Sequence, residues 1–136
     1  ILTVALLGPP ALSSVENNRM LSKTSTVDLA YRWIIENVPA GATIVLEGGH
    51  LHLAERYRDH QVPQLRRRTY DEYVEKGVDY LIASSQVYGP FFRSPREFPN
   101  EYHDYQVLFS LADEVARFSP TEDVPGPELR IFRIAP

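Results

Sequence analysis

The chain has 136 residues, which is enough for one domain with its own hydrophobic core. Its formal net charge is -4, and this acidic balance argues against a nucleic-acid-binding surface, which needs an excess of Lys and Arg. The lack of cysteine excludes a disulfide framework and any thiolate metal site.

The chain begins with an apolar run, Ile1 to Leu7, which only Thr3 interrupts. A membrane-spanning helix needs about 20 apolar residues, so this run cannot cross a membrane alone. It also lacks the basic start and the cleavage site of a signal peptide. Two interpretations stay open: a short element packed on the domain, or the last turns of a membrane helix. We therefore divide the chain into an N-terminal segment, residues 1–24, and a single α/β domain, residues 25–136.

The domain opens with a predicted helix followed by a predicted strand. Ser25 to Asp28 matches a capping box, and apolar residues then recur at helical spacing until Pro39. Residues 44–46, Ile-Val-Leu, predict a strand that is buried on both faces. We expect a short helix over residues 51–57 and a weak strand over residues 62–68.

The middle of the chain predicts a second helix and a second buried strand. The helix begins with a capping box at Thr69, and Gly77 is placed to end it as a left-handed residue. Residues 78–83 form the apolar run of the strand. Residues 84–99 contain three prolines, and we expect a proline-punctuated loop there.

The last part predicts a third helix, capped by Asn100, and a hairpin of two strands over residues 115–118 and 129–134. Alternating helices and strands indicate an α/β fold. We expect a three-layer, Rossmann-like domain whose mostly parallel sheet carries helices on both faces and ends in a C-terminal antiparallel hairpin.

Candidate binding residues cluster where the first strand ends. Glu47 lies at its carboxyl end, the edge at which ligands bind in open α/β sheets, and His50 and His52 follow. The two histidines, with Glu47, Glu55 and His60 nearby, fit no standard metal-ligand spacing, so we predict no metal site. The Gly48-Gly49 pair is likewise too little for a nucleotide fingerprint.

The predicted loop over residues 84–99 is the second candidate site. It contains Tyr88, Phe91, Phe92 and Arg93, and long ordered loops in small domains are often binding loops. Aromatic rings beside arginines suit a sugar ring, a lipid phosphate or a protein partner. The alternative is that the phenylalanines fold back and cover the edge of the sheet.

Arg66, Arg67 and Arg68 form a short basic run. Such a run either meets the anionic head groups of a membrane surface or forms a solvated face of the domain.

No catalytic residues are predicted. The serines include no Gly-x-Ser-x-Gly nucleophile elbow, and no acid pair stands out from the scattered carboxylates. We also expect no cofactor.

Five stretches resemble a known family. The resemblance covers roughly residues 12–134, and its motifs are caps, turns and buried strands. The matching pieces are Thr26-Val27-Asp28-Leu29-Ala30 with Trp33-Ile34, Asn37-Val38-Pro39-Ala40-Gly41-Ala42, Gly77-Val78-Asp79-Tyr80-Leu81-Ile82 with Ser84-Ser85 and Tyr88, Phe98-Pro99 with Tyr105 and Phe109, and Phe118-Ser119-Pro120 with Gly126-Pro127 and Ile131-Phe132-Arg133-Ile134. Together they resemble the segment after the last membrane helix of dolichyl-phosphate-mannose protein mannosyltransferase-like and aminoarabinose-transferase-like enzymes.

The resemblance implies a soluble C-terminal domain on the extracytoplasmic side of a polytopic membrane glycosyltransferase. Such enzymes transfer a sugar from a polyprenyl-phosphate carrier to a protein or lipid acceptor, and their catalytic acids lie upstream between membrane helices. The domain would be non-catalytic by itself and would help to bind acceptor or glycan. Its expected partners are the membrane domain of the same chain and a glycan, lipid-linked sugar or acceptor protein.

Two alternatives remain. One is a free-standing ligand-binding or enzyme domain with a site near Glu47, His50 and Tyr88. The other is a protein-interaction module that uses the aromatic loop 84–99.

Overall fold

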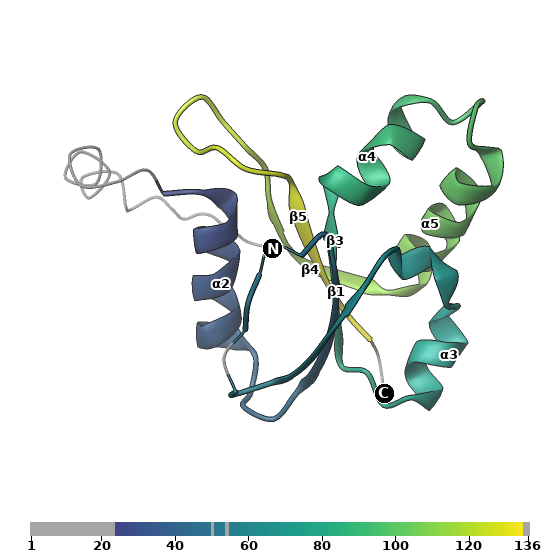
Figure 1. The fold of residues 1–136 in the computed structure, drawn as a ribbon. Helices are drawn as coiled ribbons and strands as arrows, with labels where there is room; N and C mark the ends of the chain where they lie inside the picture. The colour runs from purple at the N-terminus through teal and green to yellow at the C-terminus, as the bar shows by residue number, and fades with distance from the viewer. Residues whose placement is uncertain (1–23, 50, 54, 135–136) are drawn as a thin grey trace.

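The computed structural model describes residues 24–49, 51–53 and 55–134, and these residues form one five-stranded mixed sheet (Figure 1). The strands lie in the order β2-β1-β3-β5-β4. Strand β1 pairs in parallel with β2 and β3, whereas β5 pairs antiparallel with β3 and β4. The predicted α/β class and the antiparallel C-terminal hairpin are therefore confirmed. The strand bounds are β1 Thr43–Glu47, β2 Arg58–Val62, β3 Tyr80–Ser84, β4 Asp113–Phe118 and β5 Leu129–Arg133.

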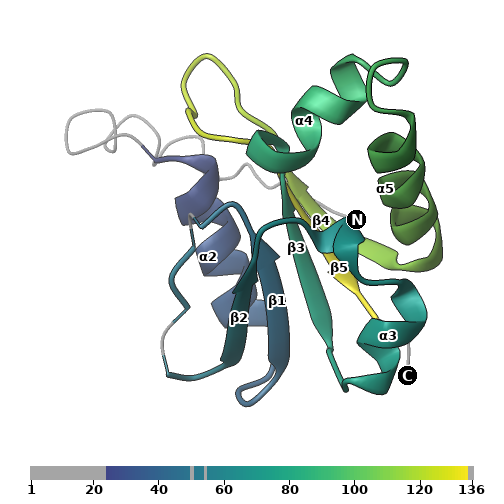
Figure 2. The same ribbon diagram turned by 45° about the vertical axis from the view of Figure 1, so that its right-hand side comes forward.

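Helices pack against both faces of the sheet (Figures 1 and 2). Helix α2 lies on one face, and its buried residues share a core cluster with Ile44, Leu46 and Ile131. The other helices lie on the opposite face, over a second cluster that includes Leu81 and Phe132. The helix bounds are α2 Thr26–Asn37, the 3-10 helix η1 Leu65–Arg67, α3 Tyr70–Glu75, α4 Ser85–Arg93 and α5 Pro99–Leu111.

Both predicted capping boxes are present. In α2 the Ser25 hydroxyl accepts from the Asp28 amide, and the Asp28 carboxylate accepts from the Ser25 amide, each over 3.1 Å. Thr69 and Glu72 make the same reciprocal pair at the start of α3. Gly77 follows α3 with φ of 73°, so its predicted left-handed conformation is also confirmed.

The prediction of a loop over residues 84–99 is wrong, because most of this segment is α4. The Ser84 hydroxyl caps the helix by accepting from the Gln86 amide at 3.3 Å. Tyr88, Phe91 and Phe92 recur at helical spacing and all pack into the second core cluster. That packing outweighs the cost of Pro90 inside the helix, which lacks the amide that would bond one turn back.

Three weaker predictions are also wrong. The described residues between 51 and 57 are irregular and not helical, since Leu51, Leu53 and Tyr57 reach individually into the core beside α2. The strand that we expected over residues 62–68 is β2, which already ends at Val62. The later part of that range forms η1. Likewise, α5 begins at Pro99, which suits the first position of a helix, and Asn100 is not its cap.

The start of α2 is joined to the loop that connects β4 and β5. The Thr26 amide donates to the carbonyl of Pro125 at 2.9 Å, and its hydroxyl donates to the carbonyl of Pro127 at 2.6 Å. Residues far apart in sequence therefore meet at the edge of the sheet where β1 ends.

Candidate functional site

Glu47 is the buried carboxylate at the carboxyl edge of the sheet. It ends β1 and is only 2% exposed. Its Oε1 accepts from the Leu65 amide at 2.9 Å and from the Tyr105 hydroxyl at 2.6 Å, and its Oε2 accepts from the Ser84 amide at 3.0 Å. Burial raises the pKa of Glu47 to about 7, although all three hydrogen bonds act to lower it. One carboxylate thus links β1, β3, η1 and α5.

Two tyrosines complete this buried polar group. Tyr105 donates to Glu47, and Tyr73 donates to the carbonyl of Leu65 at 2.7 Å. Burial, together with the nearby Glu47 carboxylate, holds the pKa of both phenols above its ordinary value. Both therefore stay protonated and act as fixed donors.

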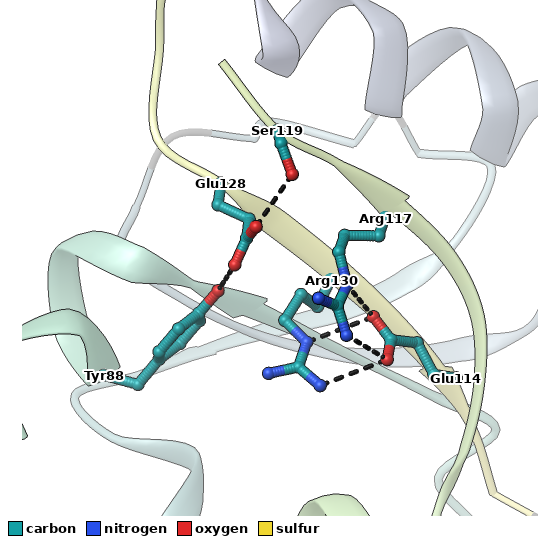
Figure 3. Close-up of polar contacts among 6 residues, drawn as sticks. All are labelled: Tyr88, Glu114, Arg117, Ser119, Glu128 and Arg130. Carbon is teal, nitrogen blue, oxygen red and sulfur yellow. Dashed lines mark hydrogen bonds and ion pairs between the residues drawn. The ribbon is translucent and has the colours of Figure 1, made fainter. Parts of the chain in front are cut away.

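A second polar group surrounds Glu128, close to Tyr88 (Figure 3). The Tyr88 hydroxyl donates to Oε1 of Glu128 at 2.5 Å, and the Ser119 hydroxyl donates to Oε2 at 2.7 Å. The Glu128 amide also donates to the Ser85 hydroxyl at 2.9 Å. Burial, followed by the hydrogen bond to Glu128, raises the pKa of Tyr88. These contacts connect the start of α4 to the C-terminal hairpin.

Arg130 is the centre of the third polar group (Figure 3). It lies on the face of the sheet that α4 and α5 cover, since its guanidinium contacts the rings of Tyr88 and Phe109. Its Nε and Nη2 atoms each donate to the Glu114 carboxylate at 3.1 Å, and Arg117 binds the same carboxylate at 2.7 and 2.8 Å. The guanidinium of Arg130 lies 4.5 Å from the centre of the Phe109 ring. Burial raises the pKa of Glu114, but the hydrogen bonds from Arg117 and Arg130 outweigh it and hold that pKa below its ordinary value.

An aromatic cluster joins these polar groups. The Tyr105 ring lies 6.2 Å from Tyr88, 6.3 Å from Phe92 and 6.0 Å from Phe91. Phe91 and Phe92 are half-buried in this cluster, so the prediction that they cover the sheet fits better than the prediction that they form an open binding loop. Most of their surface is used in packing the core.

The structure brings together only some of the predicted site residues. Tyr105 connects four of them: its hydroxyl donates to Glu47, and its ring packs against Tyr88, Phe91 and Phe92. Arg93 lies exposed in the last turn of α4, and His52 lies exposed in the irregular segment after β1. His50 and the run Ile1 to Leu7 lie outside the described residues.

Tyr105, Glu128 and Arg130 are site residues that the sequence did not predict. Tyr105 carried the only usable signal, because it belongs to a set of aromatic and apolar residues that recur at helical spacing between residues 102 and 112. Glu128 and Arg130 meet Tyr88 through the pairing of distant strands, which a local pattern does not encode.

The predicted membrane-facing arginines differ in their surroundings. Arg66 is bound to Asp104 at 2.8 Å and lies 3.9 Å from Glu101, so acids neutralise its charge. Arg67 and Arg68 are exposed and form no ion pair with another described residue. The run therefore offers two free charges and not three.

These groups can hold the fold together more readily than they can perform chemistry. In the described part of the chain, no buried side-chain polar atom lacks a hydrogen-bond partner, and no group of three potential ligands could hold a metal ion. Two surface cavities, of about 670 and 220 Å³, are lined by neither Glu47 nor Tyr88.

Among the described helices, none combines the length and apolar character needed to cross a membrane. Comparisons with models of protein families, with curated proteins and with solved structures found no match.

Proposed function

We propose that this chain is an accessory domain of a membrane glycosyltransferase, one that helps to bind acceptor or glycan and is not catalytic alone. The non-catalytic part of the proposal rests on the hydrogen bonds that occupy Glu47. Its raised pKa would suit a general acid or base, but both carboxylate oxygens are already bound by donors of the domain itself. A substrate would have to break these bonds to reach it.

The membrane and glycosyltransferase parts of the proposal rest on the family resemblance of residues 12–134. In this proposal the domain is a three-layer, Rossmann-like unit on the extracytoplasmic side, and a polyprenyl-phosphate-linked sugar is used by the membrane domain of the same parent chain. The mixed sheet with helices on both faces is compatible with that architecture.

The two alternative functions receive less support from the contacts. A free-standing site near Glu47, His50 and Tyr88 would need open polar groups, but Glu47 and Tyr88 are bound inside the domain. A protein-interaction module on residues 84–99 would need exposed rings, whereas Phe91 and Phe92 pack against Tyr105.

The proposal is tested by comparing the parent chain, the parent shortened before Ser25, and the 136-residue chain alone. Transfer of a labelled sugar from polyprenyl phosphate is measured in membrane vesicles. We expect no transfer by the 136-residue chain. The shortened parent should show a higher KM for the acceptor. Its KM for the lipid-linked donor should stay unchanged, and this unchanged value is the control for intact folding of the membrane domain.

Three results would contradict this proposal. The first is transfer by the 136-residue chain alone, the second is full acceptor affinity in the shortened parent, and the third is a parent gene that encodes no membrane helices.

A further inference from the structure

A groove of about 670 Å³ lies at the edge of the sheet where β1 and β3 begin, opposite the Glu47 edge (the lower edge in Figure 2). One wall is the turn between α2 and β1, residues 39–42, and the other is formed by residues 74 and 77–80. Arg133 and Ile134, at the end of β5, complete the lining. The volume falls within the range of about 300–1,000 Å³ that is usual for small-molecule sites.

Asp79 is held rigidly in the lining of this groove. Its amide donates to the carbonyl of Thr43, its Oδ2 accepts from the Thr43 amide, and its carbonyl accepts from the Ile134 amide, each over 2.9 Å. Its other carboxylate oxygen makes no hydrogen bond to a described residue. The side chain therefore has a fixed position and keeps one free acceptor for a ligand.

Arg133 supplies donors to the same groove. It lies directly opposite Tyr80 in the pairing of β3 with β5, and the two side chains share one face of the sheet. Its guanidinium forms no ion pair or hydrogen bond with another described residue, and this includes Asp113, its neighbour on β4. Five N–H groups are thus free to meet a ligand.

The remaining residues that line the groove contribute apolar side chains or, at the glycines, only backbone atoms. Pro39, Ala40 and Val74 contribute aliphatic surface, and the half-buried Tyr80 contributes an aromatic ring. A side chain added at Gly41 or Gly77 would meet nothing within 4 Å, so the backbone there faces open space.

We propose that this groove binds a neutral saccharide unit. The lining carries one carboxylate and one guanidinium and therefore no net charge, so it gives neither an anion nor a cation a net electrostatic attraction. A sugar carries several hydroxyls that each donate and accept, so separate hydroxyls can bind Asp79 and Arg133. The C–H faces of the sugar ring match Tyr80 and Pro39. This inference rests on the proposed function, in which the domain holds a glycan.

The test is a titration of the ¹⁵N-labelled 136-residue chain, followed by NMR. The probes are methyl glycosides of glucose, mannose and galactose and their disaccharides. At least one should give saturable shifts confined to the amides of Gly41, Gly77, Asp79 and Tyr80, with a millimolar Kd, because the groove is open to solvent.

Two variants and two controls locate the binding. Arg133→Met and Asp79→Asn should each raise the Kd about tenfold, the loss of about 1.4 kcal/mol. Asparagine can still accept from the Thr43 amide, so Asp79→Asn keeps the fold. Arg67→Met and Asp123→Asn change exposed residues outside the groove lining and should leave the Kd unchanged.

The inference is overturned if no probe gives saturable shifts at roughly 50 mM, well above a millimolar Kd. It is also overturned if inorganic phosphate binds there more tightly than every saccharide, which would make the groove an anion site. If the groove fails while the shortened parent still loses acceptor affinity, the proposed function stands without it. If the groove binds sugar but the shortened parent keeps full acceptor affinity, the proposed function fails.

Discussion

At the scale of single residues, Glu47 carries the clearest titration. Burial raises its pKa from the ordinary value of 4.5 to about 7. The native state therefore binds an extra proton between these two values. The stability that this proton contributes is fully present below pH 4.5 and is lost as the pH rises toward 7.

We expect the stability difference between the native chain and Glu47→Gln to depend on pH. The glutamine cannot titrate, so the difference should shift against the native chain by about 3 kcal/mol, at most, as the pH rises from 4.5 to 8. Urea unfolding at several pH values measures it. Ser110→Ala, an exposed substitution that changes no titratable group, is the control. A difference independent of pH would contradict the raised pKa.

Gly126 is the second residue whose replacement has a defined consequence. Its φ is 122°, a region that favours glycine, and a Cβ there would collide with the Thr26 hydroxyl oxygen. Gly126→Ala should therefore destabilise the domain by about 2–4 kcal/mol, because it adds backbone strain and separates α2 from the hairpin.

Gly49→Ala is the matched control for this prediction. Gly49 also has positive φ, of 69°, but a Cβ there would meet nothing within 4 Å. We expect it to cost only the left-handed strain, about 1–2 kcal/mol. Chemical denaturation compares the two variants, and equal losses would mean that the contact with Thr26 contributes nothing.

At the scale of elements, local chemistry predicted helices α2 and α3 and strands β1 and β3. The reciprocal caps at Ser25 and Thr69 and the short apolar runs act within a few residues, so the sequence displays them directly. The segment after Ser84 was misread because its prolines looked like loop signals. Its aromatic residues gain their helical packing only from α5 and β5, which are distant in sequence.

The candidate site was predicted only in part for the same reason. The end of a buried strand marked Glu47 as a special position. What the strand pattern did not contain was the set of donors, since Leu65, Ser84 and Tyr105 come from three other elements. The pattern therefore indicated a ligand site where the domain uses the carboxylate for its own cohesion.

Helix α4 yields a prediction that separates core cover from a binding surface. Replacing Phe91 and Phe92 together with Ser removes ring contacts at 6.0 and 6.3 Å from Tyr105. We expect a loss of about 3–5 kcal/mol, because both rings are half-buried in the core. Thermal unfolding measures it, with Arg93→Ser, exposed on the same helix, as the control. A double variant as stable as the native chain would instead favour an interaction surface.

At the scale of the whole molecule, the two edges of the sheet differ in what they leave free. The carboxyl edge, where open α/β sheets bind ligands, is occupied by the Glu47 hydrogen bonds, by the start of α4 and by the hairpin loop. The opposite edge keeps Asp79 and Arg133 available beside a groove. The fold therefore directs binding away from the edge that its topology would have indicated.

The two core clusters should unfold together, because β1, β3 and β5 contribute alternate side chains to both. Trp33 is the only tryptophan and packs against the cluster beneath α2, which also contains Tyr57, while Tyr73, Tyr88 and Tyr105 lie in the other cluster. We expect urea transitions followed by tryptophan fluorescence and by near-ultraviolet tyrosine dichroism to coincide.

Glu47→Gln sharpens this last test. The carboxylate contacts Leu65 and Tyr105, which lie on the face away from Trp33, so a local effect would move only the tyrosine signal. In a single cooperative unit the substitution shifts both midpoints by the same amount, because the sheet cannot lose one covered face and keep the other. Separate midpoints, in either chain, would show that the face covered by α2 unfolds independently of the face covered by α4 and α5.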